Sequence, residues 1–184
     1  DCYHPSPLPT TLPTHLPTSQ PTVTPLPTPL PTSQPTTVSP ETNVALQALY
    51  NATNGSAWTN RNHWLAGDPC TQSWYGITCS PGVSESTVGG EVTVLNLHGN
   101  GLKGSIPLAL SLLTAMTKLD LSSNVLFGTL ARDLGNLTNL RNLDLSTNLL
   151  RQTLPTALGS LRAMQNFSLA SNRLTGAIAT ELGA

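Results

Sequence analysis

Leucines in the second half of the chain return at a fixed spacing. From Val92 onward, four successive segments align at 24 residues without a gap, and each carries an asparagine at the same position. A period of this length predicts a solenoid, in which each coil forms a short strand and buries its leucines against the neighbouring coils. The aligned positions are Leu97, Leu121, Leu145 and Leu169; Leu110, Leu134, Leu158 and Leu182; and Asn100, Asn124, Asn148 and Asn172.

Each column of this alignment has a physical role. The leucines are expected to face inward, where each contributes roughly 1.5–3 kcal/mol on burial. The asparagines are expected to turn the chain out of the strand, because a side-chain amide can bond backbone groups that strand pairing leaves free. Gly104, Gly128 and Gly176 follow that turn, whereas the third coil has Gln152 there. Because glycine relaxes the backbone, we expect the third coil to be locally irregular.

Residues 1–40 follow a different pattern. Proline recurs at every fourth residue from Pro5 to Pro29, and the segment holds twelve of the 16 prolines together with ten threonines. Dense proline favours an extended, polyproline-II-like rod with about three residues per turn. Such a composition is typical of O-glycosylated stalks, and a bare disordered linker is the alternative. The predicted O-glycosylation sites are Thr10, Thr14, Thr18, Thr22, Thr28, Thr32 and Thr36.

Charge and apolar runs narrow the possible partners. Charged residues make up only 9% of the chain and the formal net charge is -1, so neither nucleic acid nor an anionic membrane surface is indicated. No apolar run approaches the roughly 18 residues of a spanning helix. The chain starts at Asp1 without a methionine, which indicates a removed leader or a fragment.

Candidate catalytic chemistry is sparse. His4, His15, His63 and His98 are scattered, no metal-ligand spacing occurs, and neither a glycine-rich phosphate loop nor a nucleophile motif is present. The sequence therefore predicts a protein that is not an enzyme and needs no cofactor.

The repeat line, L-x-x-L-x-L-x-x-N-x-L-x-G-x-I-P, resembles the plant-type extracellular leucine-rich repeat, with "LKGSIP" and "LTGAIA" in the family's L-x-G-x-I-P position. The preceding stretch, "ALYNATNGSAWTNRNHWLAGDPCTQSWYGITCS", is similar to the cap that opens such solenoids. This resemblance implies an α/β solenoid of short parallel strands over residues 92–184, a cap over 41–91, and the rod before it. It also implies a disulfide between Cys70 and Cys79, although eight residues separate them where the family often has six.

The cap is expected to contain a short helix with Thr42 or Asn43 as its N-cap. Its tryptophans, Trp58, Trp64 and Trp74, are expected to pack over the leucine end of the first coil as plain core residues.

Cysteine usage favours a secreted protein, with a reduced cytosolic pair as the alternative. Cys2 is left over; it could link to another chain, to a part of the protein beyond this sequence, or to nothing. Possible N-glycosylation sequons, which suit an extracellular chain, begin at Asn51, Asn54, Asn136 and Asn166.

The strand positions beside the inward leucines should form the concave face, where such solenoids usually bind. Lys118 with Asp120 is interpreted as a solvated charge pair, and the face lacks the clustered aromatics or arginines typical of recognition patches. The candidate binding residues there are Asn96, His98, Lys118, Asp120, Asn142 and Asp144.

Two functions fit these observations. The polar concave face and the rod favour a structural glycoprotein of a fibre, wall or surface coat, assembling with its own copies or with other extracellular glycoproteins. The alternative is a stalked recognition module, either a receptor ectodomain or a secreted inhibitor, that binds a protein, peptide or glycan on the concave face. Leucine-rich-repeat extensins are similar in combining a rod with repeats, but their rod follows the repeats.

Overall fold

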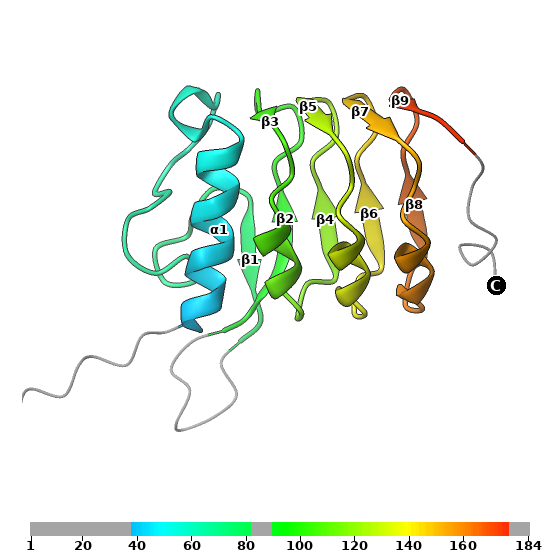
Figure 1. Ribbon diagram of the computed structural model, residues 1–184. Coiled ribbons are helices and arrows are strands. Elements are labelled where there is room, and N and C mark those ends of the chain that lie inside the picture. Colours follow the sequence, from blue (N-terminus) through cyan, green and yellow to red (C-terminus); the bar gives the residue numbers. More distant parts are fainter. Residues whose placement is uncertain (1–37, 82–89, 177–184) are drawn as a thin grey trace, which may run out of the picture. The chain divides into compact units, whose positions relative to one another are not determined.

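The computed structural model describes residues 38–81 and 90–176. The predicted rod, its threonines and Cys2 lie outside the described residues. The elements, shown in Figure 1, are α1 (Pro40–Ala52), η1 (Gly55–Ala57), β1 (Ile77–Cys79), β2 (Val92–Asn96), β3 (Lys103–Gly104), η2 (Leu108–Leu112), β4 (Lys118–Asp120), β5 (Val125–Gly128), η3 (Arg132–Asn136), β6 (Asn142–Asp144), β7 (Leu149–Gln152), η4 (Thr156–Ser160), β8 (Asn166–Ser168) and β9 (Arg173–Leu174).

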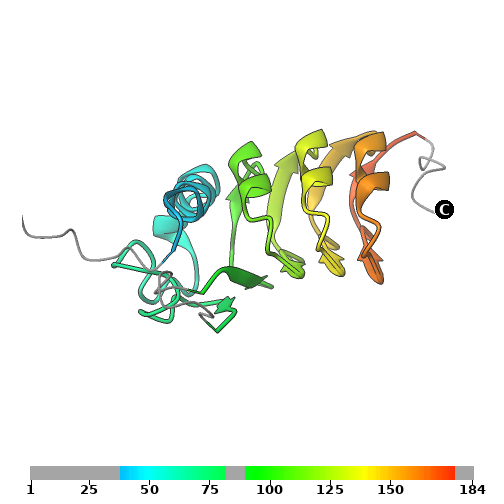
Figure 2. The same cartoon turned by 90° about the horizontal axis from the view of Figure 1, so that it is seen from below.

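One sheet runs through every coil, in the order β1-β2-β4-β6-β8, and we call it the large sheet. Strand β1 pairs antiparallel with β2, and the remaining pairs are parallel. Val94 lies beside Lys118, which in turn lies beside Asn142, so each step along the sheet is one 24-residue repeat. The predicted α/β solenoid is therefore confirmed. The large sheet forms one side of the coils and the short helices η2, η3 and η4 form the opposite side (Figure 2).

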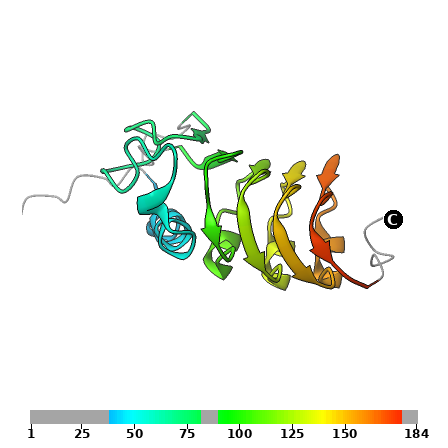
Figure 3. The same cartoon turned by 90° about the horizontal axis from the view of Figure 1, so that it is seen from above.

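A second, smaller sheet has the order β3-β5-β7-β9, and we call it the small sheet. In each coil, the strand of the small sheet comes after the turn that ends the strand of the large sheet (Figure 3). Its pairing is staggered, because Lys103 lies beside Val125, which is 22 residues further along the chain instead of 24. The same stagger recurs where Phe127 lies beside Leu149.

The core is built from the predicted leucine columns. Leu97, Leu121 and Leu145 are fully buried. Beside them, the Asn124 amide nitrogen donates to the carbonyls of Leu97 and Leu121, both at 2.9 Å. Its carbonyl oxygen accepts from the backbone N–H groups of Asn100 and Leu102 in the preceding coil. The asparagine column therefore ties successive coils together while satisfying buried backbone groups.

The third coil keeps the path of the others, so the expected irregularity is absent there. Gln152 adopts a φ of 71°, close to the 87° of Gly128 and the 85° of Gly176. A glutamine is held in the left-handed region, and the backbone of the coil is unchanged.

The start of α1 differs from the prediction. Ser39 is the N-cap, and its hydroxyl accepts a hydrogen bond from the Thr42 N–H at 3.3 Å. Thr42 and Asn43 lie inside the helix, so the predicted caps were wrong. Pro40 explains the earlier start, because proline at the first helical position has the required φ and no N–H to satisfy.

The tryptophans of the cap pack as one buried group. Trp58 and Trp64 meet edge to face with ring centroids 4.7 Å apart, and Trp64 lies 5.2 Å from Trp74. Each indole N–H donates to a backbone carbonyl at 3.0 Å. Their burial with the first-coil leucines agrees with the core role expected from sequence.

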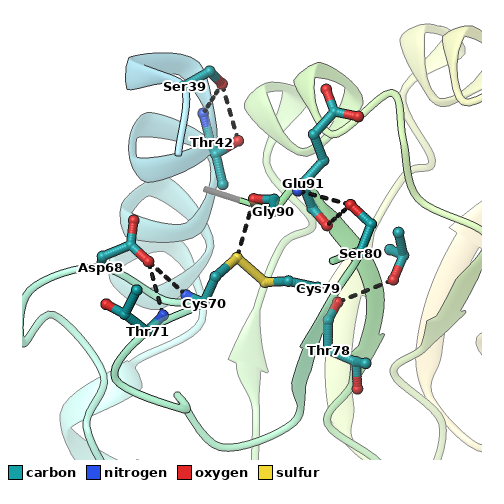
Figure 4. Close-up of a disulfide and its surroundings, with 11 residues drawn as sticks. Ser39, Thr42, Asp68, Cys70, Thr71, Thr78, Cys79, Ser80, Gly90 and Glu91 are labelled. Atoms are coloured by element: carbon teal, nitrogen blue, oxygen red, sulfur yellow. Dashed lines mark hydrogen bonds between the residues drawn. A yellow bond between two sulfur atoms is a disulfide. The ribbon is translucent and has the colours of Figure 1, made fainter. Parts of the chain in front are cut away.

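A disulfide closes the loop that carries Trp74. It joins Cys70 to Cys79 on β1, with Cα atoms 5.6 Å apart (Figure 4). Asp68 supports the loop, because one oxygen of its carboxylate accepts from the N–H groups of Cys70 and Thr71, both at 2.9 Å. The crosslink thereby holds the loop against the strand that opens the large sheet.

Candidate functional site

The outward side chains of the large sheet form one continuous surface, which we call the large-sheet face. The strand register sets them in columns. One column holds Val94, Lys118, Asn142 and Asn166, and the next holds Asn96, Asp120, Asp144 and Ser168. His98 follows β2 on the same side, so the structure brings all six predicted binding residues onto this face.

Serines hold the two carboxylates of this face in place. The Ser122 hydroxyl donates to Asp120 Oδ1 at 2.6 Å, and the Ser146 hydroxyl donates to Asp144 Oδ1 at the same distance. The backbone N–H of each serine donates to the same oxygen. Each carboxylate therefore has one anchored oxygen and a second oxygen available to a ligand.

His98 extends this arrangement, since its Nδ1 lies 2.8 Å from the Ser122 hydroxyl oxygen. The single hydroxyl proton of Ser122 goes to Asp120, so His98 Nδ1 must carry a proton and donate to Ser122. A nucleophilic serine needs the opposite polarity, with the histidine accepting its proton. Ser122 is also only 3% exposed. The hydrogen bonds hold His98 and Asp120 in place, and their polarity differs from that of a hydrolytic triad.

The sequons lie at different places. Asn51 is in α1 and Asn54 is in the turn that follows it, while Asn136 ends η3 on the opposite side from the large-sheet face. All four asparagines are exposed. Asn166 lies on the large-sheet face itself, where its amide nitrogen donates to Asn142 Oδ1 at 2.7 Å. A glycan there would lie on the large-sheet face and would leave the Asn166 amide one N–H.

Two shallow depressions mark the large-sheet face. One, of about 570 Å³, is lined by Lys118, Asp120, Asn142, Asp144, Asn166 and Phe167 among others. The other, of about 480 Å³, is lined by residues including Tyr75, Thr78, Val94, Asn96 and His98. The predicted binding residues therefore divide between two adjoining hollows.

Sequence reasoning missed Tyr75 in one hollow and the exposure of the inward-facing Phe167 at the other. Tyr75 belongs to the cap, and the antiparallel pairing of β1, with Thr78 opposite Val94, brings it to the large-sheet face. Its position within "WYGITC", beside the cap cysteines, was the available signal. Phe167 occupies an inward column, but in the fourth coil it is 37% exposed.

Within 38–81 and 90–176 no three His, Cys, Asp or Glu side chains come together as a metal site. The helices of the described part are too short or too polar to cross a membrane.

Comparison with known proteins agrees with this architecture. The Leucine Rich Repeat family model matches residues 91–113 and 139–161. The ectodomain of the receptor kinase SOBIR1 from Arabidopsis thaliana is similar over 74% of this chain, with 25% identity and a TM-score of 0.62. The fold is a leucine-rich repeat solenoid.

Two further solved structures are similar. The ectodomain of the receptor kinase GASSHO1/SCHENGEN3 from Arabidopsis thaliana, in complex with CASPARIAN STRIP INTEGRITY FACTOR 2, matches 60% of this chain at 38% identity and a TM-score of 0.50. A plant ice-binding protein matches 78% at 23% identity and a TM-score of 0.66, which shows the fold alone.

The matches cover unequal shares of these proteins. This chain spans 70% of the SOBIR1 ectodomain but 44% of the ice-binding protein and 16% of the GASSHO1/SCHENGEN3 ectodomain. A search of curated proteins found no match.

Proposed function

We propose that this chain is an extracellular recognition module that binds an extended ligand, such as a peptide, across the large-sheet face. The observation that carries the proposal is the pair of serine-anchored carboxylates, Asp120 and Asp144, set side by side in adjoining strands. Anchored groups lose little conformational freedom when a ligand binds. The similarity to receptor ectodomains, one of them in a complex, supports binding as the role.

The comparisons favour this function over a structural subunit of a fibre or coat. The structural interpretation depended on the rod, which lies outside the described residues, and on a binding face without anchors. Tyr75 supplies an aromatic group beside the polar columns, and aromatic residues are frequent anchors at interfaces. Assembly with copies of itself has no support from the described residues or from the similar proteins.

The chemistry of the face suggests what the ligand must offer. Asp120 and Asp144 favour a cationic group, while Asn96 and Asn142 can pair with peptide amides. Neighbouring strands of a sheet lie about 4.8 Å apart, so a ligand crossing the strands meets one row of side chains per strand. A peptide with a basic residue fits these requirements. Its setting is extracellular, in keeping with the disulfide and the receptor-ectodomain fold.

Selection from a displayed random-peptide library on the full chain tests the proposal. Peptides selected this way should contain basic residues, and the double variant Asp120→Asn/Asp144→Asn should bind them about tenfold or more weakly. Asparagine still accepts from Ser122 and Ser146, so the face keeps its hydrogen bonds.

A matched control removes two carboxylates elsewhere. Glu41→Gln/Asp133→Asn changes the net charge equally at positions in α1 and η3. This control should leave binding within about twofold. Two results would show that the face is not the binding site. One is an equal loss of affinity in both double variants, and the other is selected peptides that bind Asp120→Asn/Asp144→Asn as tightly as the unchanged protein.

A further inference from the structure

The small sheet presents a second surface of different chemistry. In β5, Leu126 is fully buried while Val125 and Phe127 on either side are 43% and 47% exposed. The same alternation places Leu150 inward and its neighbours Leu149 and Arg151 outward in β7. We call the outward side chains of the small sheet the small-sheet face. They are Lys103, Val125, Phe127, Leu149, Arg151 and Arg173.

These six side chains form one unbroken diagonal. Lys103 lies opposite Val125, Phe127 lies opposite Leu149, and Arg151 lies opposite Arg173. Consecutive pairs are joined by a step of two residues along β5 or β7, which keeps the side chains on the same face. From the spacings of a sheet, the diagonal is roughly 20 Å long. Figure 1 shows β3, β5, β7 and β9 following one another along one edge of the coils.

The charges of the small-sheet face have one sign. It holds three of the eight cationic side chains of the chain. The described carboxylates lie in α1, the cap loop, the segment before β2, the large sheet and η3, so none belongs to these strands. Arg151 and Arg173 lie directly opposite each other, and like charges in that relation destabilise a sheet. An anion bound between the two guanidinium groups would relieve their repulsion.

The remaining chemistry narrows the class of ligand. Guanidinium groups form bidentate pairs with carboxylates, through two parallel hydrogen bonds. Phe127, Val125 and Leu149 offer an apolar strip between the cations. None of the six side chains can accept a hydrogen bond, so sugar hydroxyls, which need acceptors as well as donors, find little here. A ligand complementary to the small-sheet face is therefore a chain with carboxylates at its ends and apolar side chains between them.

We propose that the small-sheet face is a second binding site, and that it takes an acidic peptide segment with apolar side chains from a partner protein. The site is separate from the large-sheet face and does not depend on the function proposed there.

A binding measurement on the full chain tests this site. The probes are an immobilised short peptide alternating Asp and Leu, its counterpart with Asn in place of Asp, and polygalacturonate. The Asp peptide should bind, and Arg151→Gln/Arg173→Gln should weaken it about tenfold or more. Phe127→Ser should weaken it about fivefold through the lost apolar contact. Because a displaced arginine pair could disturb β7, Lys103→Gln provides an independent variant and should weaken binding about threefold.

The matched control is Arg132→Gln/Arg162→Gln, which removes two exposed arginines outside both sheets. It should change affinity by less than about twofold. Equal loss in the two arginine pairs, equal binding of the Asn peptide, or no binding of the Asp peptide would overturn the proposal. Binding of polygalacturonate alone would replace the peptide with an acidic polysaccharide. Unchanged binding by Asp120→Asn/Asp144→Asn separates this result from that of the large-sheet face.

Discussion

Gln152 pays a conformational cost that the equivalent residues avoid. Its φ is 71°, in the left-handed region. A residue with a Cβ atom raises the free energy of the folded state there by roughly 1–2 kcal/mol, because the Cβ lies too close to the following carbonyl oxygen. Glycine would remove this strain but would lose more backbone entropy on folding, by roughly 0.5–1 kcal/mol. Gln152→Gly should therefore stabilise the protein by about 0.5–1 kcal/mol in urea unfolding. Thr153→Gly, at the exposed next position without a positive φ, should destabilise it; stabilisation by both changes would contradict the strain argument.

In the third coil, the buried side chain of Asn148 satisfies several backbone carbonyls. Its amide nitrogen donates to the carbonyls of Leu121, Leu145 and Ser146, at 3.0, 3.1 and 3.2 Å. Asn148→Asp keeps the shape but replaces these donors with an acceptor, so we expect a loss of about 3 kcal/mol or more in urea unfolding.

Asn139 provides the control for this change. It is exposed, and among the residues that the structure describes its amide donates to the Thr114 carbonyl alone, so Asn139→Asp should cost less than about 1 kcal/mol. Similar losses at both positions would mean that the asparagine column contributes no more than a surface hydrogen bond.

At the scale of elements, the cap helix and the first coil meet at Gly104. A Cβ built there would collide with the Ala52 carbonyl oxygen at the end of α1. At Gly128, the equivalent position one coil further, the nearest atom is the Ser105 Cβ, 3.6 Å away. Both glycines have a positive φ, so Gly128→Ala should cost about 1–2 kcal/mol through strain alone. Gly104→Ala should cost about 2 kcal/mol more, because α1 must also move.

Thermal and urea unfolding of the two alanine variants measures this difference. Equal destabilisation would mean that α1 can move away from the first coil freely, and that the cap is only loosely joined to the solenoid.

Periodic elements could be predicted from the sequence, whereas the others depended on contacts without a period. The leucine and asparagine columns predicted the coils, the side chains that face inward and the columns of the large-sheet face. The start of α1 was misplaced, because Pro40 was assigned to the rod although it also begins a helix well. Tyr75 was missed, because only the antiparallel pairing of β1 brings it to the face. The small sheet was not anticipated, since its two-residue stagger arises between coils and not within one repeat.

At the scale of the whole molecule, the net charge of -1 over 184 residues does not reveal that two surfaces differ in the sign of their charge. The large-sheet face concentrates anchored carboxylates at Asp120 and Asp144. The small-sheet face carries Lys103, Arg151 and Arg173 without a described carboxylate. A solenoid permits this division because each repeat presents the same position to the same side. Two ligands of opposite charge could therefore bind without competing.

The stability of the coils should fall toward the fourth one. In a solenoid each coil is stabilised by its immediate neighbours. The inward position of the large sheet is 1% exposed at Leu119 and 2% at Leu143, but 37% at Phe167. We therefore expect amide hydrogen exchange in this 184-residue chain to be fastest around β8.

Three equivalent hydrogen bonds allow a matched comparison. The backbone N–H groups of Leu97, Leu121 and Leu145 donate to backbone carbonyls in the following coil, those of Asp120, Asp144 and Ser168, at 2.8, 2.9 and 3.0 Å. Because opening the fourth coil breaks only the last of these bonds, the Leu145 amide should exchange about tenfold or more faster than the other two, after correction for intrinsic rates. Exchange measured by NMR decides the matter. Equal protection at all three amides would mean that the fourth coil opens no more readily than the inner coils, despite the exposure of Phe167.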